Sequence, residues 1–459
     1  MPSPDDRHLD ATDVAELLAM ELSPVGSRRI VGHLLAGCGL CRARIHEHQL
    51  RLGQGPKDFD AAFDVAFDAA FDAAFDTALA RSAGLIGARL AELEAGARLW
   101  CGLRDLPAGR RLLIVRNSRK HRTAGVLEAL LRDYREELWR ESRLGEEIAD
   151  LGLLIAERLD ASRYPASALA DLRGQALAIA ANARRLAWRP GEAEQLLRQA
   201  ARQLSLGSGD LLLEAELRNY QGSHRQALGR FEEAARAFQR AEHAYRTVGE
   251  PHLAARSLVA RAEAIGYLNP ERGIRLIRRA IPDIDGDRDP YLELAAHHSL
   301  AWYLNDSGQG WEARLEVGRS AGLYQRFSGD AVASLSRAWL QGRIDRSLRE
   351  LDQARRSYER AWAGFEELGM QIHLTMLAID RAELRVAGGE PGSAAALLAR
   401  TLLLLRSWGI SRDTLAALRL LRAAVVGGRC GRAAFRQASL VVRRSWAQAG
   451  TPGAGTASC

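Results

Sequence analysis

The stretch RFEEAARAFQRAEHAYRTVGEPHLAARSLVARAEAIGY, residues 230–267, decides the fold of this protein. At its start, small and apolar residues recur at positions i, i+3, i+4 and i+7, which is the pattern of an amphipathic helix. The breaker LGR at 228 precedes the stretch and NP at 269 follows it. Between these breakers a second helical stretch completes a predicted pair of helices.

The same helix pattern recurs along the chain, with starts that fall about 40 residues apart. Breakers that contain Gly or Pro separate the copies, except before residue 351, where SLRELDQA contains neither. Repeated pairs of helices, each covering the apolar face of its neighbour, form an α-solenoid. The seven copies begin with GEAEQLLRQA at 191, FEEAARAFQR at 231, ERGIRLIRRA at 271, WEARLEVGRS at 311, LDQARRSYER at 351, GSAAALLART at 392 and RAAFRQASLV at 432.

Two stretches resemble tetratricopeptide repeats: residues 230–267, quoted above, and AWYLNDSGQGWEARLEVGRSAGLYQ from residue 301. The resemblance lies in the opening of the second helix, of Gly-x-aromatic-Glu-Ala type, and in small Ala residues where helices approach closely. It covers about residues 165–447. It implies an all-α, tetratricopeptide-like solenoid of about seven helix hairpins, whose concave groove binds a peptide or a partner protein. The 40-residue period is longer than the usual 34 and is shared with bacterial peptide sensors and regulators.

The sequence GHLLAGCGLC, residues 32–41, holds a histidine and two cysteines within a short distance. Cys38-x-x-Cys41 is a common pair of zinc ligands, and His33 lies one or two turns earlier on a predicted helix. Zinc requires a fourth ligand. A predicted hairpin of helices at 11–22 and 27–37 would bring His8 to His33, with Asp10 or Thr12 as the N-cap of the first helix. His46 and His48 are the competing candidates.

This segment, about residues 8–50, resembles the zinc-binding anti-sigma factor domain, whose signature is His-x3-Cys-x2-Cys with an upstream Cys or His. The resemblance implies that His8, His33, Cys38 and Cys41 hold one structural Zn²⁺ and that the domain binds a sigma factor or another transcription component. The gap between His33 and Cys38 is four residues here, and the upstream ligand is a histidine. A decayed finger without metal and a redox-active Cys-x-x-Cys pair are the alternatives.

These patterns divide the chain into predicted domains. Residues 1–50 form the zinc finger, 51–82 a helical linker, 83–164 a connector that caps the solenoid, 165–447 the repeats, and 448–459 a disordered tail. In the linker, Phe recurs every fourth residue from 59 to 75, each time followed by Asp. We expect this stripe to pack on the finger or the solenoid. The alternatives are an acidic, aromatic surface for a basic partner, and a segment without a role.

Other features of the sequence carry less information about function. The five cysteines are too few for a disulfide framework, and the first ten residues do not form a secretion signal, so we expect a cytoplasmic protein that contacts no membrane. The net charge of +7 reflects general use of Arg, although a basic run at 104–122 keeps nucleic-acid binding as a third hypothesis. We expect His297 and His298 to be satisfied histidines of the core or the groove. We expect packing roles for five tryptophans: Trp302, Trp311, Trp339, Trp362 and Trp408.

No phosphate loop, nucleophile elbow, HExxH motif or dinucleotide fingerprint occurs in the sequence. The sequence therefore predicts a non-enzymatic regulator or adaptor that binds proteins. In the first hypothesis, the finger binds a sigma factor and the solenoid binds a peptide or a second protein. In the alternative, the solenoid is a scaffold or peptide sensor, and the finger is only a structural staple with no transcriptional partner.

Overall fold

The computed structural model describes residues 8–35, 38–52, 56–136, 142–407 and 412–446. Helices form the regular secondary structure of these residues, and no strand occurs among them. The all-α prediction is therefore confirmed. The predicted tail at 448–459 lies outside the described residues.

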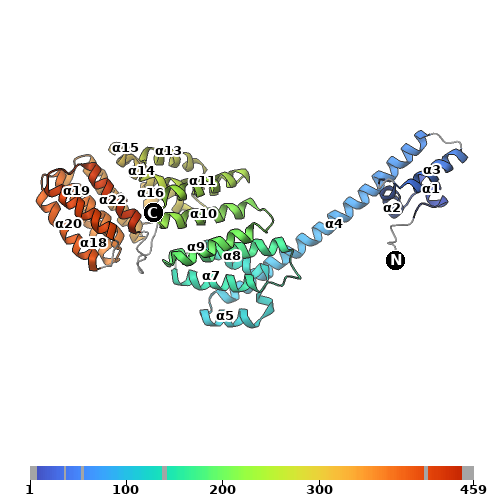
Figure 1. Cartoon of the computed structure of the whole chain (residues 1–459), viewed down its shortest axis with the longest axis horizontal. Coiled ribbons are helices and arrows are strands. Elements are labelled where there is room, and N and C mark those ends of the chain that lie inside the picture. The colour runs from blue at the N-terminus through green and yellow to red at the C-terminus, as the bar shows by residue number, and fades with distance from the viewer. Residues whose placement is uncertain (1–7, 36–37, 53–55, 137–141, 408–411, 447–459) are drawn as a thin grey trace. The chain divides into compact units, whose positions relative to one another are not determined.

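The chain divides into two compact units, residues 1–94 and 95–459. The first unit contains three short helices and most of a long fourth helix, which continues into the second unit (Figure 1). The helix α4 runs without interruption through residue 82, and the predicted domain boundaries stay predictions. The bounds are α1 (Ala11–Leu18), α2 (Pro24–Leu35), α3 (Gly39–Leu52) and α4 (Pro56–Arg104).

In the second unit, successive helices pack side by side in chain order, as expected for a solenoid (Figure 1). The unit begins with α5 (Ala108–Asn117), α6 (Ala124–Glu136) and α7 (Ser142–Glu157). The repeats follow as α8 (Ala166–Leu186), α9 (Pro190–Leu204), α10 (Leu211–Ala227), α11 (Phe231–Thr247), α12 (Pro251–Gly266), α13 (Pro270–Ala280), α14 (Pro290–Asp306), α15 (Gly310–Arg319), α16 (Ala321–Arg326), α17 (Ala331–Ser347), α18 (Leu351–Glu367), α19 (Gln371–Ala387), α20 (Pro391–Ser407), α21 (Arg412–Val426) and α22 (Arg432–Trp446).

The turns between these helices depend on residues in the left-handed conformation. Gly249 after α11 and Gly369 after α18 have φ of +75° and +65°, which glycine adopts without steric cost. Arg349 takes the same position between α17 and α18, with φ of 66°. The chain thus turns before residue 351 without the expected breaker. This conformation costs an ordinary residue about 1–2 kcal/mol, which packing of the flanking helices offsets.

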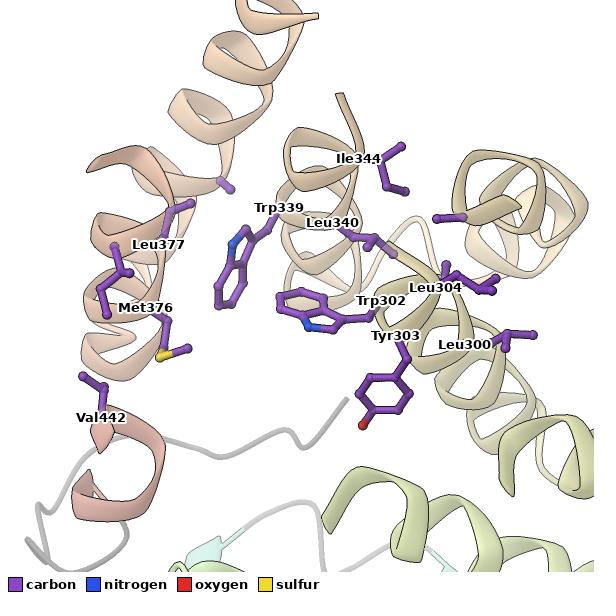
Figure 2. Close-up of a cluster of buried hydrophobic side chains, with 14 of the residues drawn as sticks. Leu300, Trp302, Tyr303, Leu304, Trp339, Leu340, Ile344, Met376, Leu377 and Val442 are labelled. Atoms are coloured by element: carbon purple, nitrogen blue, oxygen red, sulfur yellow. The ribbon is translucent and has the colours of Figure 1, made fainter. Parts of the chain in front are cut away.

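A continuous cluster of buried side chains runs through the repeats from Ala234 to Val442 (Figure 2), and smaller separate clusters lie among α8–α12. Aromatic residues from successive repeats meet in the continuous cluster. The rings of Trp302 on α14 and Trp339 on α17 contact edge to face, with centroids 5.1 Å apart. Trp302 and Trp339 therefore have the packing role that we expected. Trp311 does not, because its side chain is 63% exposed, and Trp408 lies outside the described residues.

Candidate functional site

The four predicted metal ligands lie together in the first unit. Their nearest ring nitrogen and sulfur atoms all fall within 4.8 Å of one another. The Nδ1 atom of His8 is 3.4 Å from the sulfur of Cys38 and 3.7 Å from that of Cys41, and Nδ1 of His33 is 3.9 Å from the sulfur of Cys41. His46 and His48, both on α3, are not part of this cluster.

Local structure positions the His8 side chain. The Asp10 carboxylate accepts hydrogen bonds from the backbone N–H groups of Thr12 and Asp13, and Asp13 bonds back to the N–H of Asp10. This capping box begins α1 directly after His8 and confirms Asp10 as the N-cap. Arg44 on α3 donates to the carbonyl of Leu9, which holds the same segment against the cysteine-bearing helix.

The cluster suits a metal that prefers two thiolates and two imidazoles in a tetrahedron. Around zinc, with bonds of about 2.0–2.3 Å, tetrahedral ligand atoms lie about 3.3–3.8 Å apart, close to the distances found here. Hydrogen bonds from the Cys41 backbone and from His33 lower the pKa of the Cys38 thiol to about 6. Burial raises the pKa of the Cys41 thiol, a cost that a bound cation would remove. The donor set therefore fits Zn²⁺.

The small core of this unit contains one residue of the phenylalanine stripe. Phe63 packs against the cluster of Leu17, Ile30 and Ile45, as expected for a stripe that contacts the finger. Phe67 and Phe71, one and two turns further along α4, have exposed side chains. Stacking along the helix joins the three rings, with centroids 6.3 and 6.5 Å apart. The side chains of Phe59 and Phe75 lie outside the described residues.

The second candidate site is a cavity of about 350 Å³ in the solenoid, which we call the inner pocket. Its lining comes from helices that span α8 to α22, so the repeats curve around it. The walls are rich in aromatic side chains, and Figure 2 shows three of the aromatic residues of the pocket, Trp302, Tyr303 and Trp339. The aromatic lining residues are Trp188, Phe231, Phe238, Tyr267, Trp302, Tyr303 and Trp339.

Glu263 on α12 is the acidic residue of the inner pocket. Among the described residues, the structure gives its carboxyl group no hydrogen bond and no ion pair. Burial alone raises the pKa of Glu263 to about 8. The pocket thus holds one acid that is costly to ionise until a cation comes near it.

The histidines and Arg443 of the pocket are neutral at ordinary pH or contact other side chains. The ring of His298 is hydrogen-bonded through Nδ1 to the Tyr324 hydroxyl at 2.8 Å, and burial lowers its pKa to about 4. Burial likewise lowers the pKa of His373 to about 4. The guanidinium of Arg443 on α22 lies 3.7 Å from the centre of the Tyr267 ring, a cation–π contact. The sequence predicts a satisfied histidine of the core or the groove at position 298, and the structure places His298 in the wall of the pocket with a hydrogen-bond partner.

Several arginines of the basic run at 104–122 form hydrogen bonds and ion pairs within the protein. Arg111 is buried, donates to the carbonyl of Arg104 and pairs with Glu147. Arg104 pairs with Asp133, and Arg122 donates to the carbonyl of Val115. These pairings favour a structural role for the run over a nucleic-acid surface.

The chain has structural neighbours among solved proteins. The chain is similar in structure to a Rap protein crystallised with competence and sporulation factor, at 15% identity and a TM-score of 0.55, over 71% of this chain and 88% of that one. RapI in its apo form has 12% identity and a TM-score of 0.45, over 70% and 98% of the two chains. Aspartyl phosphate phosphatase F from Bacillus subtilis has 13% identity and a TM-score of 0.43, over 76% of this chain and 93% of that one.

The fold defines the class of the protein as an all-α, tetratricopeptide-like solenoid. The sequence matches no family model and no curated protein. Among the described residues, no helix has both the length and the apolar character needed to cross a membrane.

Proposed function

We propose that the protein is a non-enzymatic regulator whose solenoid binds a peptide or an extended segment of a partner protein in the inner pocket. The observation that carries this proposal is an aromatic cavity built from successive repeats, with the unpaired Glu263 in its wall. A structural neighbour crystallised with competence and sporulation factor supports a binding role for this kind of fold.

The lining indicates the chemistry of the ligand. Aromatic walls bury apolar side chains, and their faces attract cations. A carboxylate in the same cavity pairs with an ammonium or guanidinium group and is ionised by it. The pocket therefore suits a peptide that carries an apolar and a cationic side chain.

The test is selection of binding peptides from a random heptapeptide library displayed on phage, with the immobilised full chain as the target. Selected peptides are synthesised and titrated by calorimetry. We expect Trp302→Ala to weaken binding at least tenfold, because Trp302 lines the pocket, and Trp311→Ala to leave it unchanged, because Trp311 is exposed and absent from the lining. Equal effects of the two substitutions would place the binding site elsewhere.

For the first unit, we propose that His8, His33, Cys38 and Cys41 bind one structural zinc ion. We expect about one zinc per purified chain by mass spectrometry of the metal, and loss of it after Cys38→Ser, His33→Ala or His8→Ala. His46→Ala is the matched control, since His46 lies outside the cluster. Loss of zinc after His46→Ala but not after His8→Ala would reassign the fourth ligand.

We further propose that the zinc finger binds a sigma factor or another transcription component, as its resemblance to the anti-sigma factor domain implies. A pull-down with the full chain from the native host should recover such a protein, and the Cys38→Ser chain should not. Recovery of the same partners by both chains would favour the alternative, in which the finger is a staple.

We also propose that the protein is cytosolic. None of the four described cysteines forms a disulfide bond, which supports this location.

A further inference from the structure

The last helix, α22, is attached to the solenoid in two different ways. Its apolar face packs on the last repeat, where Phe435, Ala438 and Val442 are buried and α22 contacts α19 and α21. The hydrophobic effect thus anchors α22 to the last repeat.

The other attachment joins α22 to repeats far away in the sequence, through arginine side chains and through the Arg444 backbone, which lies close to Gly229 before α11. Arg436 donates to the carbonyls of Tyr267 and Leu268, at 3.4 and 3.3 Å, at the C-terminal end of α12. Arg444 pairs with Glu232 on α11 at 3.1 Å. Cations are favourable at a helix C-terminus, where carbonyls lack partners within the helix.

The ion pair among these distant contacts is weak because water reaches it. The side chains of Arg444 and Glu232 are 46% and 59% exposed, and exposed ion pairs contribute little to stability. The arginine contacts can therefore break while Phe435 and Val442 stay buried. The two attachments make α22 a helix with one fixed and one releasable edge.

The releasable edge lies at the inner pocket. Arg443 lines this pocket and also a neighbouring cavity of about 290 Å³. Its guanidinium lies over Tyr267 and, at 5.9 Å, over Trp302, both of which line the two cavities. Arg443 therefore occupies the aromatic surface that a cationic ligand would use.

We propose that α22 is a latch that regulates the inner pocket: the docked helix places Arg443 on the aromatic wall, and ligand binding requires its release. This inference rests on the proposed peptide-binding function. Latch docking and ligand binding then compete, and the ionic contacts of α22 set the affinity for the ligand.

The experiment uses a charge swap in the full chain. Arg444→Glu places two acids opposite each other and should release the latch, whereas Glu232→Arg combined with Arg444→Glu restores an opposite pair. Hydroxyl-radical footprinting of Tyr267 reports latch release without any ligand, and the buried Tyr358 is the internal reference. Calorimetry with a peptide selected on the wild-type chain reports affinity.

We expect Arg444→Glu to raise oxidation of Tyr267 and to strengthen peptide binding by about two- to fivefold, as the loss of one exposed ion pair allows. The double variant should restore both values. Peptide binding that stays unchanged or weakens while Tyr267 becomes accessible would overturn the latch and leave the proposed function intact. Unchanged oxidation of Tyr267 in Arg444→Glu would also overturn it. If no peptide binds the wild type or the released variant, the proposed function fails and the regulation fails with it.

Discussion

At the scale of single residues, the inner pocket depends on a few groups whose environment differs from water. Glu263 is the clearest case, since burial raises its pKa to about 8 with no compensating partner among the described residues. An acid whose pKa is raised this far is retained at a cost to stability, which is typical of functional positions. The sequence pattern alone does not distinguish Glu263 from a glutamate on an exposed face of a helix.

Glu263 makes the stability of the free protein depend on pH. Its pKa in the folded chain, about 8, lies above the ordinary glutamate value of 4.5, so the folded state binds the extra proton between these values. The free energy of unfolding therefore falls as pH rises from about 4.5 through 8. Glu263→Gln should remove this loss and be more stable than the wild type at pH 8.5 by roughly 2–4 kcal/mol.

Urea unfolding at a series of pH values checks this prediction. The groups that face the same pocket, His298, His373, Arg185 and Arg443, are present in both proteins and contribute equally to the two curves. The two proteins should have similar stability near pH 5. Parallel curves from pH 5 to 8.5 would show that Glu263 has an ordinary pKa.

At the scale of the elements, helices of a hairpin pack through a small residue on one helix and an aromatic ring on the other. A Cβ atom on Gly222 of α10 would lie 2.6 Å from the Phe238 ring of α11. A Cβ on Gly342 of α17 would lie 2.5 Å from the Tyr358 ring of α18. The two pairs occupy equivalent places in repeats three periods apart, so close approach at glycine is part of the repeat itself.

Gly342→Ala should destabilise the protein by about 1–3 kcal/mol, because Tyr358 is fully buried and cannot move away from the added methyl group. Gly318→Ala is the matched control. Gly318 lies inside α15, is exposed, and has no neighbouring atom within 4 Å of the place that a Cβ would take, so alanine should stabilise by up to about 1 kcal/mol through helix propensity. Chemical unfolding measures both; a neutral Gly342→Ala would disprove the tight packing.

At the scale of the whole molecule, the two compact units depend on different sources of stability. The solenoid unit has a core that continues through successive repeats, and each helix mainly contacts its neighbours in the chain. In the first unit, α1, α2 and α3 have only 8, 12 and 14 residues. Isolated helices of this length are marginal in water, so this unit depends on its small core and, as we propose, on a zinc ion.

Removal of zinc should therefore unfold the finger and leave the solenoid intact. We expect a strong zinc chelator to increase amide hydrogen exchange in residues 8–52, while exchange in the buried helices of residues 166–446 stays unchanged. Mass spectrometry of peptic fragments resolves the two regions. The Cys38→Ser chain should show the fast exchange without chelator. Unchanged exchange of residues 8–52 after verified loss of zinc would contradict the role of the metal as a staple.

Much of the fold follows from the sequence because its causes are local. The helix pattern depends on residues three and four apart, and the 40-residue repeat predicts stacked pairs from it. The cysteine pair and His33 lie within nine residues, and a single hairpin is enough to predict that His8 joins them. Before residue 351 the sequence lacks the Gly or Pro that marks the other turns. A turn forms there nevertheless, because Arg349 takes the left-handed conformation that glycine adopts elsewhere.

The inner pocket and the latch, by contrast, could not be predicted from the sequence, because only the tertiary structure brings their residues together. Trp302 on α14 and Trp311 on α15 lie only nine residues apart in sequence, yet one lines the cavity and the other is exposed, because the curvature of the solenoid determines which face points inward. The pocket collects side chains from Arg185 to Arg443, and α22 reaches Glu232 across more than two hundred residues. Periodicity determines each hairpin, whereas the small rotations between hairpins add up along the solenoid and determine which distant residues meet.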